Sequence, residues 1–197
     1  MKPRPTSKPK LVDLVARIES VTDHLTQFWA HADGWAPEGA GELLGKSRLD
    51  RFSGLTKCLR LWVRPTKLPD LEGGLILAWT NLGSLAESAI KLYLAVFYQD
   101  YCADVKAPSK KGKRAAPDEL TLEQLRQYLE RKDLLSKKSR RFVSKIQPRR
   151  NAIHSFRHRD IGTFGDFRNA VRSYLSLLED VNNHLPYPDG SYDPGNA

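Results

Sequence analysis

The segment "QPRRNAIHSFRHRD", residues 147–160, concentrates the side chains of this chain that could do chemistry. It contains four arginines, two histidines and a single acid, which is its last residue. A histidine, whose ordinary pKa is near 6.5, can accept or donate a proton at neutral pH. An arginine stays charged and offers a planar fork of donors to phosphate oxygens. An arginine and a histidine placed together could therefore catalyse proton transfer on a phosphate ester.

Two arginines compete as the partner of His154 in this segment. On a regular helix Arg150 and His154, four residues apart, share a face, whereas Arg149 lies about 140° away from that histidine. Pro148 complicates this geometry, because proline disrupts a helix interior and favours the first position of a new turn. Spacing alone therefore leaves both Arg149 and Arg150 as partners of His154.

The surroundings of these residues are strongly basic. From Lys137 to Arg159 the sequence has nine lysines and arginines and no acid. Such runs often contact nucleic-acid phosphates, although they also occur as solvated faces. Apolar residues recur through the run at intervals of three and four, which indicates that the segment packs as a helix. The residues predicted to bind nucleic acid are Lys137, Lys138, Arg140, Arg141, Lys145, Arg157 and Arg159. His158, four residues after His154, could be a second proton carrier if the helix continues that far, but a surface cap before Gly162 is the favoured interpretation.

Two other polar residues could assist the arginine. Asn151 lies directly after Arg150, inside the motif. Glu87 and Lys91 are spaced i and i+4 in an otherwise apolar segment. They could form an exposed helical ion pair worth a few tenths of a kcal/mol, or Glu87 could face the arginine-rich helix and orient a cationic group there. Both interpretations remain open.

Other catalytic chemistries have no support in the sequence. It contains no HExxH, no paired Glu-x-x-His, no phosphate-binding loop ending in Lys-Ser or Lys-Thr, and no GxSxG. We therefore expect no metal and no cofactor. Cys58 and Cys102 each lack a CxxC companion, which suits a reducing compartment better than a disulfide framework.

Composition limits the class of protein and of partner. The chain has 197 residues, of which 40% are hydrophobic and 28% charged, with a net charge of +9 and a pI near 9.6. These values are typical of a globular protein, and the positive charge points to a polyanionic partner, nucleic acid before membrane, although many soluble proteins are basic without binding nucleic acid. The longest uncharged run, residues 73–86, is shorter than the roughly 20 residues that span a bilayer. No apolar signal-peptide core follows the basic start of the chain. We expect a cytoplasmic protein without membrane contact.

Hydrophobic periodicity predicts an all-α, up-and-down helical bundle. We expect helices over about 9–31, 40–63 and 75–101, one from either 118 or 121 to about 135, one from 137 into the motif, and one over 164–184. The segment 75–101 is apolar on nearly every side, as a central helix would be. No segment alternates apolar and polar residues like a half-buried strand.

Composition also suggests how the chain is divided. Residues 1–9 are predicted to be a flexible basic arm, and residues 10–70 an N-terminal helical extension. Residues 71–186 would form the main bundle, interrupted by a mobile basic loop at 106–117 that is rich in lysine, glycine and proline. The turn-rich residues 187–197 would be a loosely held tail.

The motif Arg149, "RNAI", His154 resembles the signature of HEPN domains (higher eukaryote and prokaryote nucleotide-binding). In that superfamily an arginine is followed, after four to six residues, by a histidine late in a helical bundle. The order of the apolar helix, the motif and the last helix also resembles that superfamily over about residues 72–186. One departure concerns the residue after the arginine, which is commonly asparagine: here it is Arg150, and Asn151 follows. Arg149 matches the family arginine, with Arg150 as its rival.

The resemblance implies a function. A HEPN ribonuclease is a metal-independent homodimer in which arginine and histidine cleave RNA by attack of the ribose 2′-hydroxyl, so Arg149 and His154 would be catalytic. A 2′,3′-cyclic phosphate product and inactivity on DNA would follow. Such an enzyme could be a toxin or a phage-defence effector with an antitoxin or other protein partner. The alternative is a non-catalytic HEPN-like bundle that binds RNA, nucleotides or proteins.

Overall fold

Helix α5 (Leu71–Val96) runs through the middle of the molecule because it is apolar on nearly every side. The Asp70 side chain caps its start by accepting a hydrogen bond from the Gly73 N–H at 2.5 Å. Most of the other helices of the bundle contact α5. The predicted central helix is therefore confirmed, although it ends at Val96, and the chain turns at Phe97 into the short helix α6 (Tyr98–Ala103).

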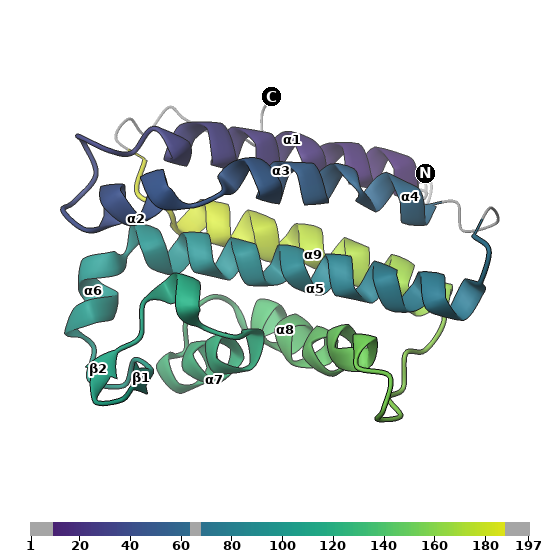
Figure 1. The fold of residues 1–197 in the computed structure, drawn as a ribbon. Coiled ribbons are helices and arrows are strands. Elements are labelled where there is room, and N and C mark those ends of the chain that lie inside the picture. Colours follow the sequence, from purple (N-terminus) through teal and green to yellow (C-terminus); the bar gives the residue numbers. More distant parts are fainter. Residues whose placement is uncertain (1–9, 64–67, 188–197) are drawn as a thin grey trace, which may run out of the picture.

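The computed structural model describes residues 10–63 and 68–187, and its helices are arranged in layers around α5 (Figure 1). Above α5 lie α1 (Leu11–Ala30), α3 (Leu49–Lys57) and α4 (Leu59–Val63), with α2 (Ala40–Lys46) at one end. Helix α9 (Phe164–His184) lies beside α5, and α7 (Leu122–Lys132) and α8 (Lys137–Arg150) lie below. Short 3-10 turns occupy Pro117–Glu119 (η2) and Asn151–Ile153 (η3).

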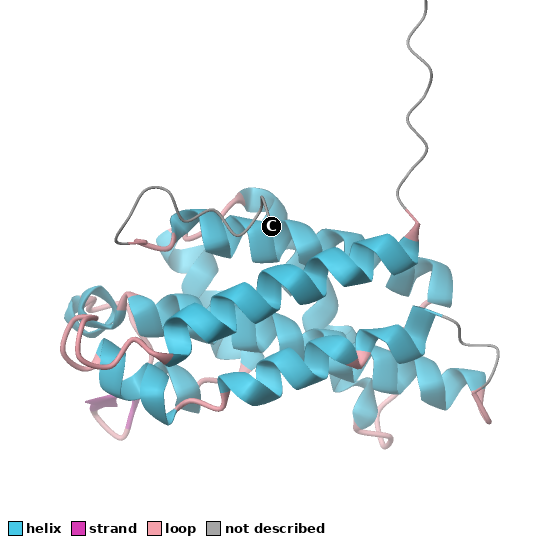
Figure 2. Ribbon diagram, turned by 90° about the horizontal axis from the view of Figure 1, so that it is seen from above, coloured by secondary structure: helices cyan, strands magenta, loops and turns pink. Residues whose placement is uncertain are grey.

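The predicted all-α bundle is confirmed. Viewed from above, the axes of the long helices are roughly aligned, and the small hairpin lies at one end of the bundle (Figure 2). Helices α1 and α9 confirm the predictions for 9–31 and 164–184, and a capping box of Thr121 and Gln124 starts α7, so residue 121 rather than 118 precedes that helix. None of the helices in the described ranges combines the length and apolar character that a bilayer-spanning segment requires.

The region predicted as an N-terminal extension shares its core with the rest of the chain. Helix α1 packs against both α3 and α9, and its buried residues belong to the same cluster as those of α5, α8 and α9. Trp29 of α1, 1% exposed, also contacts Tyr187 beyond α9, with ring centroids 5.9 Å apart. The boundary predicted near residue 70 therefore does not divide the core.

The prediction of a single helix over residues 40–63 is wrong. The structure has three short helices there, because Ser47 is extended and Arg48 leaves the helical region before α3 begins. The Ser47 hydroxyl donates to the Leu43 carbonyl at 2.7 Å and so closes the end of α2. Three glycines in this stretch, at 41, 45 and 54, lower its helix propensity.

The predicted basic loop at 106–117 contains a hairpin, β1 (Ser109–Lys110) paired with β2 (Lys113–Arg114). Lys111 and Gly112 have φ angles of 52° and 75°, as a tight hairpin turn requires. The Tyr101 hydroxyl donates to the Ala115 carbonyl at 2.6 Å. The hairpin is therefore attached to the bundle.

The predicted terminal segments lie mostly outside the described residues. Residues 1–9 and 188–197 are among those that the structure does not describe. Tyr187, which was predicted to begin the loosely held tail, packs edge-on against Phe28, with ring centroids 5.0 Å apart. Its hydroxyl also donates to the Asn182 side chain at 2.5 Å. Tyr187 therefore belongs to the bundle.

Candidate functional site

One face of α8 carries a stripe of cations. Lys138, Arg141, Lys145 and Arg149 are spaced at three, four and four residues, so they project from the same side of the helix. The helix is oriented by its apolar side, where Val143 is fully buried and Phe142 and Ile146 are nearly so. The basic run of the sequence thus folds into a stripe beside a packed face.

This stripe borders a cleft of about 920 Å³ between α8, α9 and the segment that connects them. Six lining residues are lysine or arginine and two are aspartate. The cleft is therefore electropositive and suited to phosphate groups. Its lining comprises Trp79, Lys138, Arg141, Phe142, Lys145, Ile146, Pro148, Arg149, Arg157, His158, Arg159, Asp160, Asp166, Asn169, Ala170 and Ser173.

Arg149 lies over an indole ring in this cleft. Its guanidinium carbon is 4.7 Å from the centroid of Trp79, which is 1% exposed. The Trp79 Nε1–H donates to the Ile161 carbonyl at 2.8 Å, and this bond fixes the ring. A cation–π contact with a fixed ring restrains the guanidinium while leaving its N–H groups able to bind a ligand.

The loop before α9 comes unusually close to Arg149 at Gly162. Gly162 has φ +61°, and a Cβ there would lie 3.0 Å from the Arg149 Nη2 and 2.7 Å from the Asp166 Oδ2. The positive φ angle favours glycine at this position, and a larger residue would displace the ends of the Arg149 and Asp166 side chains.

Asp166 caps α9 next to Arg149. Its carboxylate accepts hydrogen bonds at 2.8 Å from both the backbone N–H and the hydroxyl of Thr163. These bonds, and secondarily the charge of Arg149, lower the pKa of Asp166. The cleft thus contains a carboxylate that stays ionised and limits the excess positive charge.

Arg150 has different surroundings. Its guanidinium pairs with Glu87 at 3.1 Å, and Glu87 also pairs with Lys91 at 2.8 Å. The aliphatic stem of Arg150 packs on Gly83, where an added Cβ would lie 2.4 Å from the Arg150 Cγ. Glu87 therefore forms the helical ion pair with Lys91 and also faces the arginine-rich helix, so contacts from both interpretations of the sequence are present. The arginine with which it pairs is Arg150 and not Arg149. Of the two arginines, only Arg149 lines the cleft.

Of the two histidines of this segment, the motif residue His154 lies outside the cleft, whereas His158 lines it. Helix α8 continues through Pro148 to Arg150, so no new turn begins at Arg149, and the helix then tightens into η3. The His154 N–H donates to the Asn151 carbonyl at 3.2 Å, and the His154 side chain is exposed. His154 is not among the residues that line the cleft, whereas His158 is.

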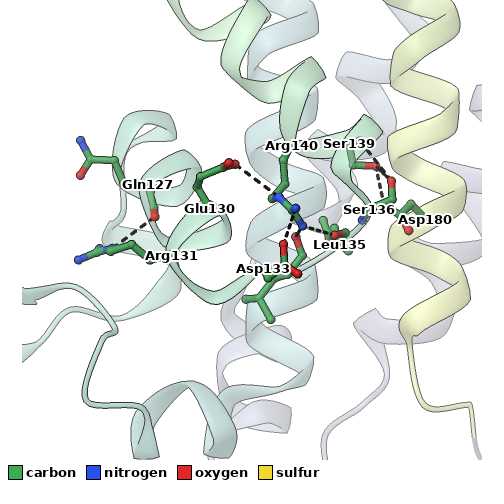
Figure 3. A network of polar contacts seen from close by, with 10 residues as sticks. Gln127, Glu130, Arg131, Asp133, Leu135, Ser136, Ser139, Arg140 and Asp180 are labelled. Carbon is green, nitrogen blue, oxygen red and sulfur yellow. Dashed lines mark hydrogen bonds and ion pairs between the residues drawn. The ribbon is translucent and has the colours of Figure 1, made fainter.

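Two of the predicted nucleic-acid contacts do not face the cleft. Arg140 points away from it, toward the end of α7, where it pairs with Glu130 and Asp133 and donates to the Leu135 carbonyl at 2.7 Å (Figure 3). Its side chain is 12% exposed, so Arg140 is removed from the candidate interface. Lys137 is exposed but lies outside the cleft lining. Lys138, Arg141, Lys145, Arg157 and Arg159 do line it.

The sequence did not reveal several residues of the cleft. Trp79, Asn169 and Ser173 come from segments that carry no motif, and Trp79 resembles any other apolar residue of a core helix. The three-four-four spacing of cations in α8 was a visible signal of a one-sided stripe. Among the residues that the structure describes, no group of three or more His, Cys, Asp or Glu side chains could hold a metal ion. Neither protein-family models nor curated proteins nor solved structures give a match for this chain.

Proposed function

We propose that this protein is a metal-independent endoribonuclease that binds RNA along the cleft between α8 and α9. The observation that carries the proposal is the placement of Arg149, the arginine of the Arg-x4-His motif. It lies on Trp79 in a cleft bordered by five further cations. Arg149 would bind the non-bridging oxygens of the scissile phosphate, whose charge develops during cleavage.

In this proposal His154 transfers protons during the reaction. The 2′-hydroxyl loses its proton to His154, its oxygen attacks phosphorus, and the bond from phosphorus to the 5′-oxygen breaks as that oxygen takes a proton from the protonated histidine. The products are a 2′,3′-cyclic phosphate and a 5′-hydroxyl, and DNA is not cut. General acid–base catalysis of this kind contributes about 10²–10⁴ in rate.

The proposal includes a homodimer, as the resemblance to HEPN domains implies. His154 is exposed at the end of η3 and does not line the cleft of its own chain. A second copy related by a two-fold axis would place a second motif next to the first, so that one composite site would contain both. The proposed location is the cytoplasm.

The test is cleavage of a single-stranded RNA by the purified protein in excess EDTA, with products identified by mass spectrometry. We expect a 2′,3′-cyclic phosphate, and we expect His154→Ala to lower the rate at least 100-fold. His31→Ala, which replaces an exposed histidine at the end of α1, is the matched control. Full activity of His154→Ala would refute the assignment of His154. Loss of cleavage in His158→Ala with retention in His154→Ala would transfer the role to His158.

A second candidate, a non-catalytic RNA-binding bundle, is favoured by the absence of His154 from the cleft lining. It predicts RNA binding that weakens steeply with salt, and no product under any condition. An acidic protein, such as an antitoxin, could occupy the same electropositive cleft. Binding of RNA and of such a protein would then be mutually exclusive in a competition assay.

A further inference from the structure

Phe156 presents an apolar ring to solvent immediately beside the motif. Residues 154–157 form a turn in which the Arg157 N–H donates to the His154 carbonyl at 3.4 Å. Phe156 stands at the tip of this turn with a relative exposure of 108%. Because the ring is fully accessible, a planar ligand could stack on it, and the adjacent cleft supplies the phosphate-binding cations that such a ligand would need.

The surroundings of Phe156 favour an anionic ligand. The next residue, Arg157, lines the cleft together with Arg159, and the chain contains no acid between Lys137 and Arg159. Single-stranded nucleic acids are bound by this combination: cations track the phosphates while an aromatic side chain stacks on a base.

We propose that Phe156 is a stacking platform for an unpaired nucleobase of an RNA strand whose phosphates lie in the cleft. The substrate class would then be single-stranded RNA, because a base within a duplex is stacked on its neighbours and offers no free face. This inference rests on the proposed binding of RNA in the cleft, but it does not require that the RNA be cleaved.

The size of the apolar surface argues for a base rather than a protein. Ile153, 43% exposed, ends η3 just before this turn, and the residues between Ile153 and Phe156 and directly after Phe156 are polar. A stable protein interface buries about 800 Å² on each partner. One phenyl ring and part of one isoleucine supply only a small share of that area, whereas a phenyl ring is similar in size to one nucleobase.

The test is a binding titration by fluorescence anisotropy with labelled 2′-O-methyl oligonucleotides, which lack the nucleophilic hydroxyl and stay intact. One probe is a single strand and the other is the corresponding duplex. We expect Phe156→Ala and Phe156→Leu to weaken binding of the single strand about 10- to 100-fold. Phe156→Trp should retain it, and duplex binding should not change. Val105→Ala, at another exposed apolar residue (88%), is the control.

Three outcomes would overturn the inference. Phe156→Leu could bind the single strand as well as Phe156→Trp does, which would mean that apolarity and not stacking matters. The alanine variant could lose affinity equally for the duplex. It could also dissociate a dimer in light scattering, which would make Phe156 an interface residue. Stacking with no cleavage of unmodified RNA would refute the nuclease alone, whereas absence of any RNA binding would refute both.

Discussion

At the scale of single residues, Arg149 and Arg150 show how adjacent and identical side chains acquire different roles. Successive positions on a helix point about 100° apart, so the two guanidinium groups leave α8 in different directions. Arg149 meets the ring of Trp79, whereas Arg150 meets the carboxylate of Glu87. The first is free to bind an anion in the cleft, and the second is already paired with one.

Arg149→Lys should separate catalysis from folding. Lysine keeps the charge but lacks the planar fork, so we expect kcat for RNA cleavage to fall about 10²- to 10³-fold, as when an oxyanion donor is removed. Thermal unfolding should give a Tm close to that of the unmodified protein. A Tm drop of many degrees would indicate that Arg149 is a structural residue.

Arg150→Met should have the opposite effect. It removes the partner of a half-buried carboxylate, which leaves Glu87 with Lys91 alone, and we expect the free energy of unfolding in urea to fall by about 1–2 kcal/mol. Cleavage per folded molecule should be unchanged. If Arg150→Met abolished cleavage without loss of stability, the motif arginine would be Arg150.

At the scale of elements, the stripe on α8 predicts how RNA affinity depends on salt. Lys145 borders the cleft, whereas Lys137 is exposed on the same helix outside it. In Lys145→Ala the slope of log K against log salt concentration should become shallower by about one, since one phosphate contact is lost. Lys137→Ala should leave the slope unchanged. Equal effects of the two variants would show that the cleft does not select the RNA path.

The start of α8 is joined to α9 through Asp180. Asp180 accepts hydrogen bonds from the Ser136 N–H at 2.8 Å and the Ser139 hydroxyl at 2.5 Å (Figure 3). Burial by itself would raise the pKa of Asp180, but these hydrogen bonds outweigh it and lower the pKa. A carboxyl group with a lowered folded-state pKa stabilises the fold above its unfolded value, near 3.9, and loses this effect as pH falls through the folded pKa.

Asp180→Asn should therefore destabilise the protein in a pH-dependent way. We expect the free energy of unfolding to fall by about 1–2 kcal/mol at pH 7, because charge-assisted hydrogen bonds are lost. The difference from the unmodified protein should shrink below about pH 4. Urea titrations at pH 7 and pH 3.5 measure both values. A difference that grew on acidification would contradict the assigned role.

At the scale of the whole molecule, the shared core predicts that residues 71–187 do not fold alone. Without α1 to α4, the faces of α5 and α9 that they cover would be exposed. The loss includes the contacts of Ile18, Leu25 and Trp29, each at most 1% exposed. At roughly 1.5–3 kcal/mol for each buried side chain, these three alone contribute about as much as the lower part of the 5–15 kcal/mol that is typical of a domain. A cooperative urea transition of the fragment, with residues 10–187 as the control, would disprove this.

The fold could be predicted from the sequence wherever one helix has a strong apolar period and clear ends. Helix α9 was predicted over the residues it occupies because its apolar period is regular, and the structure adds a capping box of Thr163 and Asp166 at its start. The prediction of one helix over residues 40–63 failed because the apolar spacing continues across Ser47 and Arg48, where the backbone is not helical. The hairpin was not predicted because strands of two residues are too short to show an alternating apolar pattern.

The sequence by itself determined the helical class, the excess of positive charge near the motif and the presence of Arg149, Arg150 and His154 within six residues. These properties are local, since they depend on residue type and on spacing along one helix. Only the tertiary structure decided that Glu87 pairs with Arg150, that Trp79 lies under Arg149, and that His158 rather than His154 lines the cleft. Each of these facts joins residues from segments that only packing brings together, and helix packing depends on all the side chains of the core at once.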